Sequence, residues 1–247
     1  MARPPQDTPV TQSPSLLQFD LDQLVRNLRA DGVAVAGILP PDLLSRVRAV
    51  TAKLPPGEYG DFDENPHVRA MVQCGATLAV ARGYLRAEPA LLECNLVVAH
   101  AENPADALAK DSQRFFHFDY AGWHSLNLFV YLTDVSEDSG AHQVVVGTHR
   151  TGKLRDALRA AVPDEQIMAR YPGRIRTITG PAGTMFFEDT AAFHRRKMHA
   201  GRRVMLNILF ASHRSWLSKG RLTVKYSNYL RSSAAAHESQ MSRSVLP

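Results

Sequence analysis

The chain has 247 residues, of which 45% are hydrophobic and 21% are charged, and it contains 15 Gly and 15 Pro. This composition is typical of a globular protein and excludes collagen-like, coiled-coil and wholly disordered chains. The formal net charge is +5, but the basic residues are scattered and form no RNA-binding or zinc-finger motif, so we expect no nucleic-acid partner.

The cysteines and the apolar segments indicate a cellular location. Two cysteines, Cys74 and Cys94, are too few for a disulfide framework, which favours a reducing environment. No window approaches the roughly 18–20 consecutive apolar residues of a membrane span, and residues 1–15 lack the apolar segment of a secretory signal. We therefore expect a cytoplasmic protein without a membrane span, and its oligomeric state stays open.

The pattern along the chain predicts one folded domain over residues 16–231. Residues 1–15 are rich in Pro, Ser and Thr without periodicity, and residues 232–247 are small and polar. Both segments have the composition of chain ends that bury little apolar surface. We therefore expect a disordered tail at residues 1–15 and a flexible tail at residues 232–247.

The first part of the domain is predicted to be mainly helical. Apolar side chains recur at helical spacing over residues 21–28 and again over residues 43–54, which predicts two amphipathic helices. The apolar run 32–39 between them has the length of a strand and ends at prolines. Residues 67–93 are rich in Ala, Leu and Arg and favour further helix.

The second part of the domain is rich in short β-type segments. They are separated by turn residues and lie at 95–100, 114–120, 125–135, 142–147, 174–180, 183–189 and 203–212. Among them, only residues 153–170 have a helical character. Many short strands with turns between them are typical of a sandwich or barrel. We therefore predict a mainly β domain with flanking α-helices.

The segment 114–120 carries His117 and Asp119. Side chains alternate along a strand, so both lie on one face, where an imidazole and a carboxylate can bind one metal ion. This spacing is common by chance, so its meaning depends on further ligands. His194 is a third candidate ligand, and Arg203 follows at the start of the last strand-like segment.

Two histidines and one carboxylate on a β scaffold form the ligand set of non-heme Fe(II) oxygenases. This set leaves coordination positions open for a cosubstrate and O₂. An arginine beyond the second histidine is suited to bind the far carboxylate of a dicarboxylate cosubstrate.

Two stretches of the chain, residues 116–150 and 180–210, resemble the phytanoyl-CoA dioxygenase-like family of Fe(II)/2-oxoglutarate oxygenases. The likeness combines the His-x-Asp motif, an acidic turn ending in Gly, a Gly-Thr-His segment and a distal His followed by Arg, and it extends faintly to residues 28–44. The resemblance implies a double-stranded β-helix, that is a cupin-like jelly roll, with helices on one side. It also implies Fe(II) as the metal, 2-oxoglutarate as the cosubstrate and O₂ as the oxidant.

Carried over to this chain, the resemblance makes His117, Asp119 and His194 the iron ligands and Arg203 the anchor of the 2-oxoglutarate carboxylate. Arg202 is the competing anchor. Strand alternation favours Arg203, because it shares a more polar face with Met205 and Asn207.

The segment 125–135 has two faces of different character. Leucines and Val130 occupy one face, and if that face packs outward, Asn127, Phe129 and Tyr131 line the cavity beside the metal. By family analogy this strand helps to bind 2-oxoglutarate. The alternative is a filled apolar interior with one buried Asn. Further histidines that could line the mouth of the site are His100, His124, His142 and His199.

The chain departs from the family in two places. It has Val146 where Pro often precedes the Gly-Thr-His segment, and residues 195–197 are Arg-Arg-Lys where Gly often follows the distal His. We interpret this basic segment as a solvated surface loop, with recognition of an anionic substrate as the alternative.

The function predicted from these residues is that of an oxidoreductase, a dioxygenase that hydroxylates an aliphatic C–H of a small molecule and releases succinate and CO₂. Two alternatives stay open. One is a jelly-roll isomerase or binding protein that holds a different metal, and the other is a catalytically silent scaffold.

Overall fold

The computed structural model describes Leu17 and residues 20–52, 58–59, 66–99, 114–119, 124–151, 161–197 and 201–212. The first helix, α1 (Leu21–Asp31), begins where the Asp20 side chain accepts a hydrogen bond from the Gln23 N–H, at 3.0 Å. It ends at Gly32, whose φ of 82° suits glycine. These local signals explain why the predicted helix begins and ends there.

Three further helices precede the β-rich part: α2 (Pro41–Thr51), α3 (Pro66–Val72) and α4 (Gly75–Leu85). The helical prediction for residues 67–93 is therefore correct up to residue 85. It is wrong at its end, because residues 90–93 belong to a strand that pairs over nearly its whole length with residues 203–211. A ladder of backbone hydrogen bonds outweighs a weak helical propensity.

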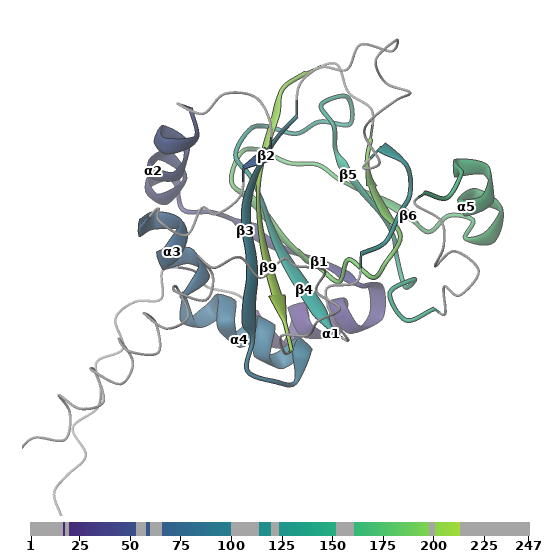
Figure 1. Ribbon diagram of the computed structural model, residues 1–247, viewed down its shortest axis with the longest axis horizontal. Coiled ribbons are helices and arrows are strands. Elements are labelled where there is room, and N and C mark those ends of the chain that lie inside the picture. Colours follow the sequence, from purple (N-terminus) through teal and green to yellow (C-terminus); the bar gives the residue numbers. More distant parts are fainter. Residues whose placement is uncertain are drawn as a thin grey trace, which may run out of the picture.

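The larger sheet has six strands, and every neighbouring pair is antiparallel. Across the sheet, the order is β1 (Val33–Ile38), β7 (Thr184–Glu188), β4 (Ser125–Tyr131), β9 (Arg203–Ala211), β3 (Ala90–Ala99) and β2 (Glu58–Tyr59). The N-terminal β1 thus lies beside β7, far away in sequence (Figure 1).

The smaller sheet has three antiparallel strands in the order β6 (Ile175–Ile178), β5 (His142–Val145) and β8 (His194–Arg196). Beyond β5, the Val146 N–H donates to the Arg174 carbonyl at 2.9 Å. The proline that the family often has at this position has no N–H and could not make this bond. A short helix, α5 (Asp164–Arg170), precedes β6.

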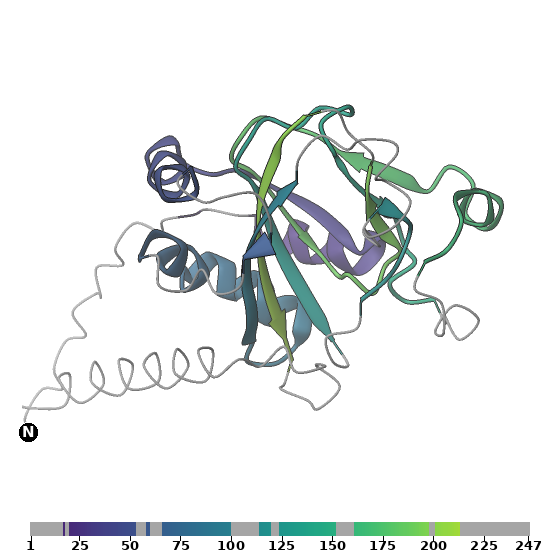
Figure 2. The same cartoon turned by 45° about the horizontal axis from the view of Figure 1, so that its top comes forward.

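The two sheets face one another and form a jelly roll, with α1 and α4 against the larger sheet (Figures 1 and 2). The mainly β fold with flanking helices is therefore confirmed. The largest apolar cluster joins these helices to the outward face of the larger sheet, where Leu126, Leu128, Leu206 and Ile208 are buried. A second cluster, between the sheets, contains Phe129, Tyr131, Val144, Phe186 and Met205.

Two predicted elements take a different form in the structure. Residues 114–119 form only isolated bridges, at Phe116 and His117, in place of a continuous strand. The helical prediction for residues 153–170 holds only for α5, and residues 152–160 lie outside the described residues. The expected tails, 1–15 and 232–247, also lie outside them. Within the described part of the chain, no helix is long and apolar enough to cross a membrane.

Candidate active site

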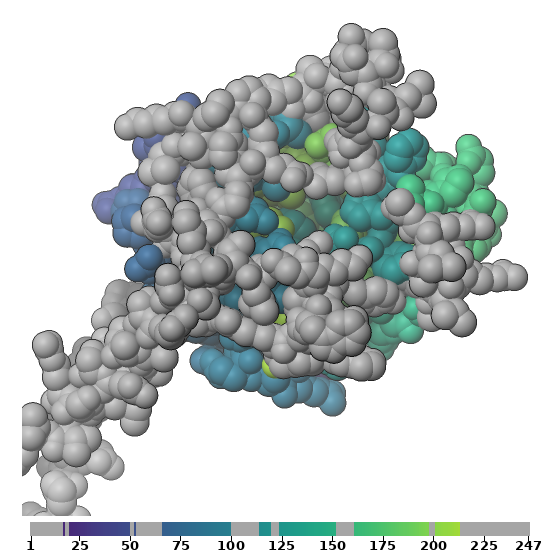
Figure 3. Space-filling view, in the orientation of Figure 1, coloured from purple at the N-terminus to yellow at the C-terminus, as the bar shows by residue number. Residues whose placement is uncertain are grey.

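A cavity of about 290 Å³ lies between the two sheets and brings most of the predicted site residues together. In the space-filling view of Figure 3, residues in blue-teal and yellow-green, the colours of β3 and β9, are visible near the centre of this face. The cavity is lined by His117, Asp119 and His194, by Asn127, Phe129, Arg203, Met205 and Asn207, and by Glu93, Val97, His142, Thr190, Arg195 and Arg196.

Backbone hydrogen bonds hold the three candidate metal ligands side by side. His117 and His194 form an isolated antiparallel bridge, in which each N–H donates to the other's carbonyl at 3.0 and 2.8 Å. Two residues further, the Asp119 N–H donates to the Thr190 carbonyl at 2.8 Å. The segment 117–119 therefore runs alongside residues 190–194, and His117 and Asp119 reach the same side without a regular strand.

The ring orientations of both histidines suit metal binding. The Nδ1 atom of His117 lies 2.8 Å from the Phe115 carbonyl, and that of His194 lies 3.0 Å from the Ala192 carbonyl. A carbonyl can only accept, so each Nδ1 carries a hydrogen and Nε2 is the atom left to bind a metal; at His194 the metal would have to displace a proton from Nε2, because the pKa of this ring is raised. Such second contacts fix the ring of a metal-binding histidine.

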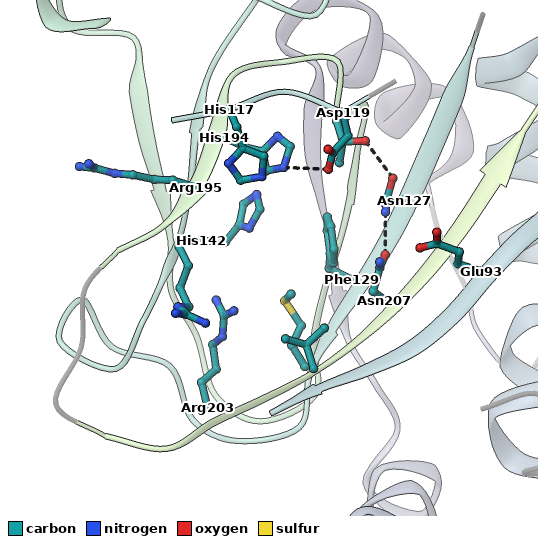
Figure 4. A pocket seen from close by; sticks show the side chains of 14 residues that line it. Glu93, His117, Asp119, Asn127, Phe129, His142, His194, Arg195, Arg203 and Asn207 are labelled. Carbon is teal, nitrogen blue, oxygen red and sulfur yellow. Dashed lines mark hydrogen bonds and ion pairs between the residues drawn. The ribbon is translucent and has the colours of Figure 1, made fainter. Parts of the chain in front are cut away.

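The ligand atoms of His117, Asp119 and His194 all lie within 4.8 Å of one another. The Nε2 of His194 is 3.6 Å from Oδ2 of Asp119, and Figure 4 shows this contact. Two ligands at right angles around an ion, with bonds of about 2.1 Å, lie about 3 Å apart. Small side-chain adjustments would therefore close this group around a divalent cation.

Burial and neighbouring charges separate the pKa values of the two histidines. Burial, and then the nearby His194, lower the pKa of His117 to about 4. Burial also acts to lower the pKa of His194, but Asp119 and Glu188 outweigh it and raise this pKa to about 9. His117 is therefore a neutral ligand, and the Asp119 carboxylate in the ligand group creates a negative potential that favours a cation.

Arg203 reaches the cavity from the start of β9, as strand alternation predicts. Its side chain is only 1% exposed, and its Nη1 donates to the Gly140 carbonyl at 2.5 Å. Arg202 is exposed and does not line the cavity. Figure 4 shows the Arg203 guanidinium pointing toward the interior, below His142. A buried guanidinium at this position can bind a carboxylate through two parallel hydrogen bonds, that is, in a bidentate manner.

The structure places the three predicted β4 residues differently. Asn127 and Phe129 line the cavity, and the Asn127 amide donates to Oδ1 of Asn207 at 2.6 Å. Tyr131 is not among the lining residues. Its hydroxyl donates to the Ile178 carbonyl at 2.9 Å and accepts from the His142 N–H at 3.0 Å, and burial raises its pKa to about 12. Tyr131 therefore holds the smaller sheet in place from behind the cavity.

Glu188 is the functional candidate that the sequence reasoning missed. It ends β7, it is fully buried, and its Oε2 lies 2.6 Å from Nε2 of His142. A carboxylate at the end of an apolar strand was the available signal, because an unpaired charge is rarely buried. His142 was one of four histidines expected near the mouth, whereas His100 and His199 lie outside the described residues.

The basic segment 195–197 is not a solvated loop. It belongs largely to β8, where Arg195 contacts Asp164 at 2.5 Å and lies over the Phe116 ring at 4.2 Å from its centroid. Lys197 pairs with Glu137 at 2.9 Å. Carboxylates of the protein therefore balance the charges of Arg195 and Lys197, which weakens the basis for expecting an anionic substrate.

The fold and the candidate site together describe a jelly-roll protein with two histidines and one carboxylate grouped at a cavity. No protein-family model matches the chain. Over 114 residues it is 29% identical to "L-proline trans-4-hydroxylase" of Streptomyces griseoviridis, an alignment that covers 34% of this chain and 40% of the hydroxylase. The chain thus matches well under half of that relative's length.

Solved structures share the fold at low sequence identity. AviO1 from Streptomyces viridochromogenes Tue57 has a TM-score of 0.56 at 15% identity, and 78% of this chain and 96% of that chain are covered. HygX from Streptomyces hygroscopicus, solved with nickel and 2-oxoglutarate bound, has a TM-score of 0.56 at 15% identity, with 76% and 86% covered. SnoN, described as a non-heme α-ketoglutarate-dependent epimerase from nogalamycin biosynthesis, has a TM-score of 0.55 at 18% identity, with 83% and 86% covered.

Proposed function

We propose that this protein is an Fe(II)/2-oxoglutarate-dependent dioxygenase that hydroxylates an aliphatic C–H of a small molecule. One observation carries the proposal: the cavity of a jelly roll holds two histidines, a carboxylate and a buried arginine. The partial likeness to a proline hydroxylase, and the nickel and 2-oxoglutarate bound in HygX, support it.

The donor set fits iron. His117, Asp119 and His194 offer two imidazole nitrogens and one carboxylate oxygen, which is the ligand set of non-heme Fe(II) oxygenases and leaves positions for further ligands. The contacts of both Nδ1 atoms with backbone carbonyls orient the two Nε2 atoms before any metal arrives. In this proposal these three residues are the iron ligands.

The donor set and the cavity also fit 2-oxoglutarate. Arg203 would bind the carboxylate that lies away from the metal, and its burial strengthens this ion pair because little water competes for it. Asn127 and Phe129 would form the adjoining wall. Tyr131 would act on the cosubstrate only indirectly, through the backbone of His142.

When bound, iron would supply the activation of O₂, coupled to the conversion of 2-oxoglutarate into succinate and CO₂ and to oxidation of the substrate C–H. The protein binds and orients the reactants and keeps water from the reacting atoms. Arg203 sets the direction of the cosubstrate, and the apolar faces of Phe129 and Met205 exclude water beside it. We also keep the predictions that the protein is cytoplasmic and that its substrate is a small molecule.

The fate of the substrate tests this proposal. The enzyme is supplied with Fe(II), 2-oxoglutarate and ¹⁸O₂ and is given a panel of small molecules that begins with L-proline, the substrate in the relative's name. We expect succinate together with a product that has gained one ¹⁸O atom, and we expect neither from the Asp119→Ala variant. A product of unchanged mass formed without succinate would favour the isomerase alternative. Iron-loaded protein that forms no succinate with any compound would contradict the proposal.

A further inference from the structure

The buried side chains of His142 and Glu188 have been assigned no direct contact with iron or 2-oxoglutarate so far. The first residue of β5, His142, is 4% exposed, and Glu188 is fully buried at the end of β7. Their contact of 2.6 Å joins the smaller sheet to the larger one. Removing a carboxylate from water costs free energy, so a buried carboxylate is expected to have a compensating partner or a functional role.

The Glu188 carboxylate contacts the ring of His142 more closely than the ring of His194. Its Oε2 is 2.6 Å from Nε2 of His142, whereas its Oε1 is 3.7 Å from Nδ1 of His194. The Nδ1 of His194 already makes a hydrogen bond to the Ala192 carbonyl at 3.0 Å. The contact with His142 therefore falls within hydrogen-bonding distance, and the one with His194 does not.

The His142 ring is fixed on several sides. It stacks on the His194 ring with centroids 5.5 Å apart and an angle of 18°, and Phe129 and Phe186 lie 5.2 and 5.4 Å from it. The His142 N–H donates to the Tyr131 hydroxyl at 3.0 Å. A ring held in this way by packing and by Glu188 presents one defined surface to the cavity that it lines.

The position of the His142 ring in the cavity indicates which molecule it can contact. Figure 4 shows His142 between the His117, Asp119 and His194 cluster on one side and Arg203 on the other. Under the proposed function, on which this inference rests, 2-oxoglutarate spans from the metal to Arg203. A molecule that takes this path lies alongside the His142 ring.

We propose that His142 is a 2-oxoglutarate-binding residue and that Glu188 is the positioning residue that holds its ring in the binding orientation. The pair then sets the affinity for the cosubstrate and leaves the affinity for the metal nearly unchanged. A purely structural pair would instead stabilise the fold without acting on either ligand.

Calorimetric titration of the full-length protein separates these roles, with Ni(II) as a metal that does not turn over. For wild type and for His142→Gln, His142→Phe and Glu188→Gln, three quantities are measured: the Kd for Ni(II), the Kd for 2-oxoglutarate on Ni(II)-loaded protein, and Tm. We expect the Kd for 2-oxoglutarate to rise about tenfold in the Glu188→Gln and His142→Gln variants, because each change removes the contact between the Glu188 carboxylate and the imidazole ring that holds the ring in place. We expect the Kd for Ni(II) in each variant to stay within about threefold of the wild-type value.

The double variant His142→Gln, Glu188→Gln should bind 2-oxoglutarate no more weakly than the weaker single variant, because both changes disrupt one contact. Thr184→Val is the matched control. This buried β7 residue donates to the Pro181 carbonyl at 2.7 Å and does not line the cavity. Loss of this hydroxyl should lower Tm and leave the Kd values for Ni(II) and for 2-oxoglutarate unchanged. His142→Gln keeps a hydrogen-bonding group and serves if His142→Phe does not fold.

Three results have distinct meanings. An unchanged Kd for 2-oxoglutarate in all variants, with a lower Tm, would overturn the proposal and make the pair structural. A larger loss of Ni(II) than of 2-oxoglutarate affinity in Glu188→Gln would also overturn it, because Glu188 would then act through His194. Metal-loaded wild type that binds no 2-oxoglutarate would instead contradict the proposed function itself.

Discussion

The two sheets of the jelly roll differ in size, in support and in what they bring to the cavity. The larger sheet has long strands, β3 and β9, paired over nearly their whole lengths, and its outer face is covered by helices. The smaller sheet has strands of three or four residues. Arg203, Asn127 and Phe129 come from the larger sheet, whereas His194 comes from the smaller sheet and His117 is joined to it by one bridge.

This difference teaches that the two walls of the site are stabilised in different ways. Continuous backbone ladders fix the wall that carries Arg203, Asn127 and Phe129. The wall that carries the metal ligand His194, which we call the metal wall and which also carries His142, depends on individual side chains: the Thr148 hydroxyl donates to the Val145 carbonyl at 2.7 Å and accepts from the Phe193 N–H at 3.0 Å, directly before His194. Loss of one such side chain should therefore matter more at the metal wall than at the other wall.

The largest effect is expected from removing a metal ligand. His117→Ala and Asp119→Ala should each weaken Fe(II) binding by more than about 100-fold, because two remaining ligands cannot complete the facial set. The fold should persist, since both side chains lie partly exposed at the cavity. Anaerobic metal titration and circular dichroism measure the two properties. His124→Ala, which removes an exposed histidine, is the control, and equal metal binding in all variants would refute the assignment.

The next effect should separate the two walls. Arg203→Ala is expected to raise the Kd for 2-oxoglutarate about 10- to 100-fold, since a hydrogen-bonded charge contributes about 1.5–3 kcal/mol. Fe(II) affinity should stay close to that of wild type. Arg202→Ala, at the exposed neighbouring position, should bind 2-oxoglutarate normally. If Arg202→Ala proves the more damaging change, the anchor has been assigned to the wrong arginine.

A smaller effect tests the side-chain support of the metal wall. Thr148→Val leaves the buried Phe193 N–H without its acceptor and is expected to lower the free energy of unfolding by about 1–3 kcal/mol. Thr151→Val removes a half-buried hydroxyl that bonds to the Thr148 carbonyl, and it should cost less than about 1 kcal/mol. Urea denaturation gives both values. Equal losses in the two variants would show that Thr148 has no special role beside His194.

The smallest effects concern the link between α4 and the segment before His194. The Tyr84 hydroxyl donates to Oδ2 of Asp189 at 2.6 Å, and Asp189 accepts from the Ala191 N–H at 3.0 Å. Tyr84→Phe should therefore cost about 1–2 kcal/mol of unfolding free energy. Glu88→Gln removes the exposed pair with Arg82 and should cost less than about 0.5 kcal/mol. The reverse ranking in thermal melts would show that the α4 link does not stabilise this segment.

Much of the larger sheet could be predicted from the sequence. Alternation along β4 and β9 separates apolar from polar positions, and the structure buries Leu128 and Ile208 under the helices while Asn127 and Arg203 face the cavity. Such a pattern is readable because each side chain's face follows from its position in a long strand. The sequence also predicted that His117 and Asp119 lie on one side, but in the structure the pairing with residues 190–194 brings them there and not the alternation of a regular strand.

In the smaller sheet, β5 and β6 could be predicted as strands from the sequence, but β8 and the contacts between the two sheets could not. A strand of three residues such as β8 carries no periodic signal, so residues 195–197 resemble a loop in the sequence. Tyr131 alternates onto the inward face as predicted, but hydrogen bonds to Ile178 and His142 place it behind the cavity. The pairing of Glu188 with His142 depends on the approach of two sheets, which no local pattern encodes.

The central proposal is that one cavity binds Fe(II) through His117, Asp119 and His194 and binds 2-oxoglutarate through the metal and Arg203. Anaerobic titration of the Fe(II)-loaded protein with 2-oxoglutarate tests it most directly, because two-oxygen chelation of Fe(II) produces a weak visible charge-transfer band. We predict that the band appears with wild type and that Arg203→Ala needs a far higher 2-oxoglutarate concentration to produce it. Iron-loaded protein that shows no band would contradict the proposal.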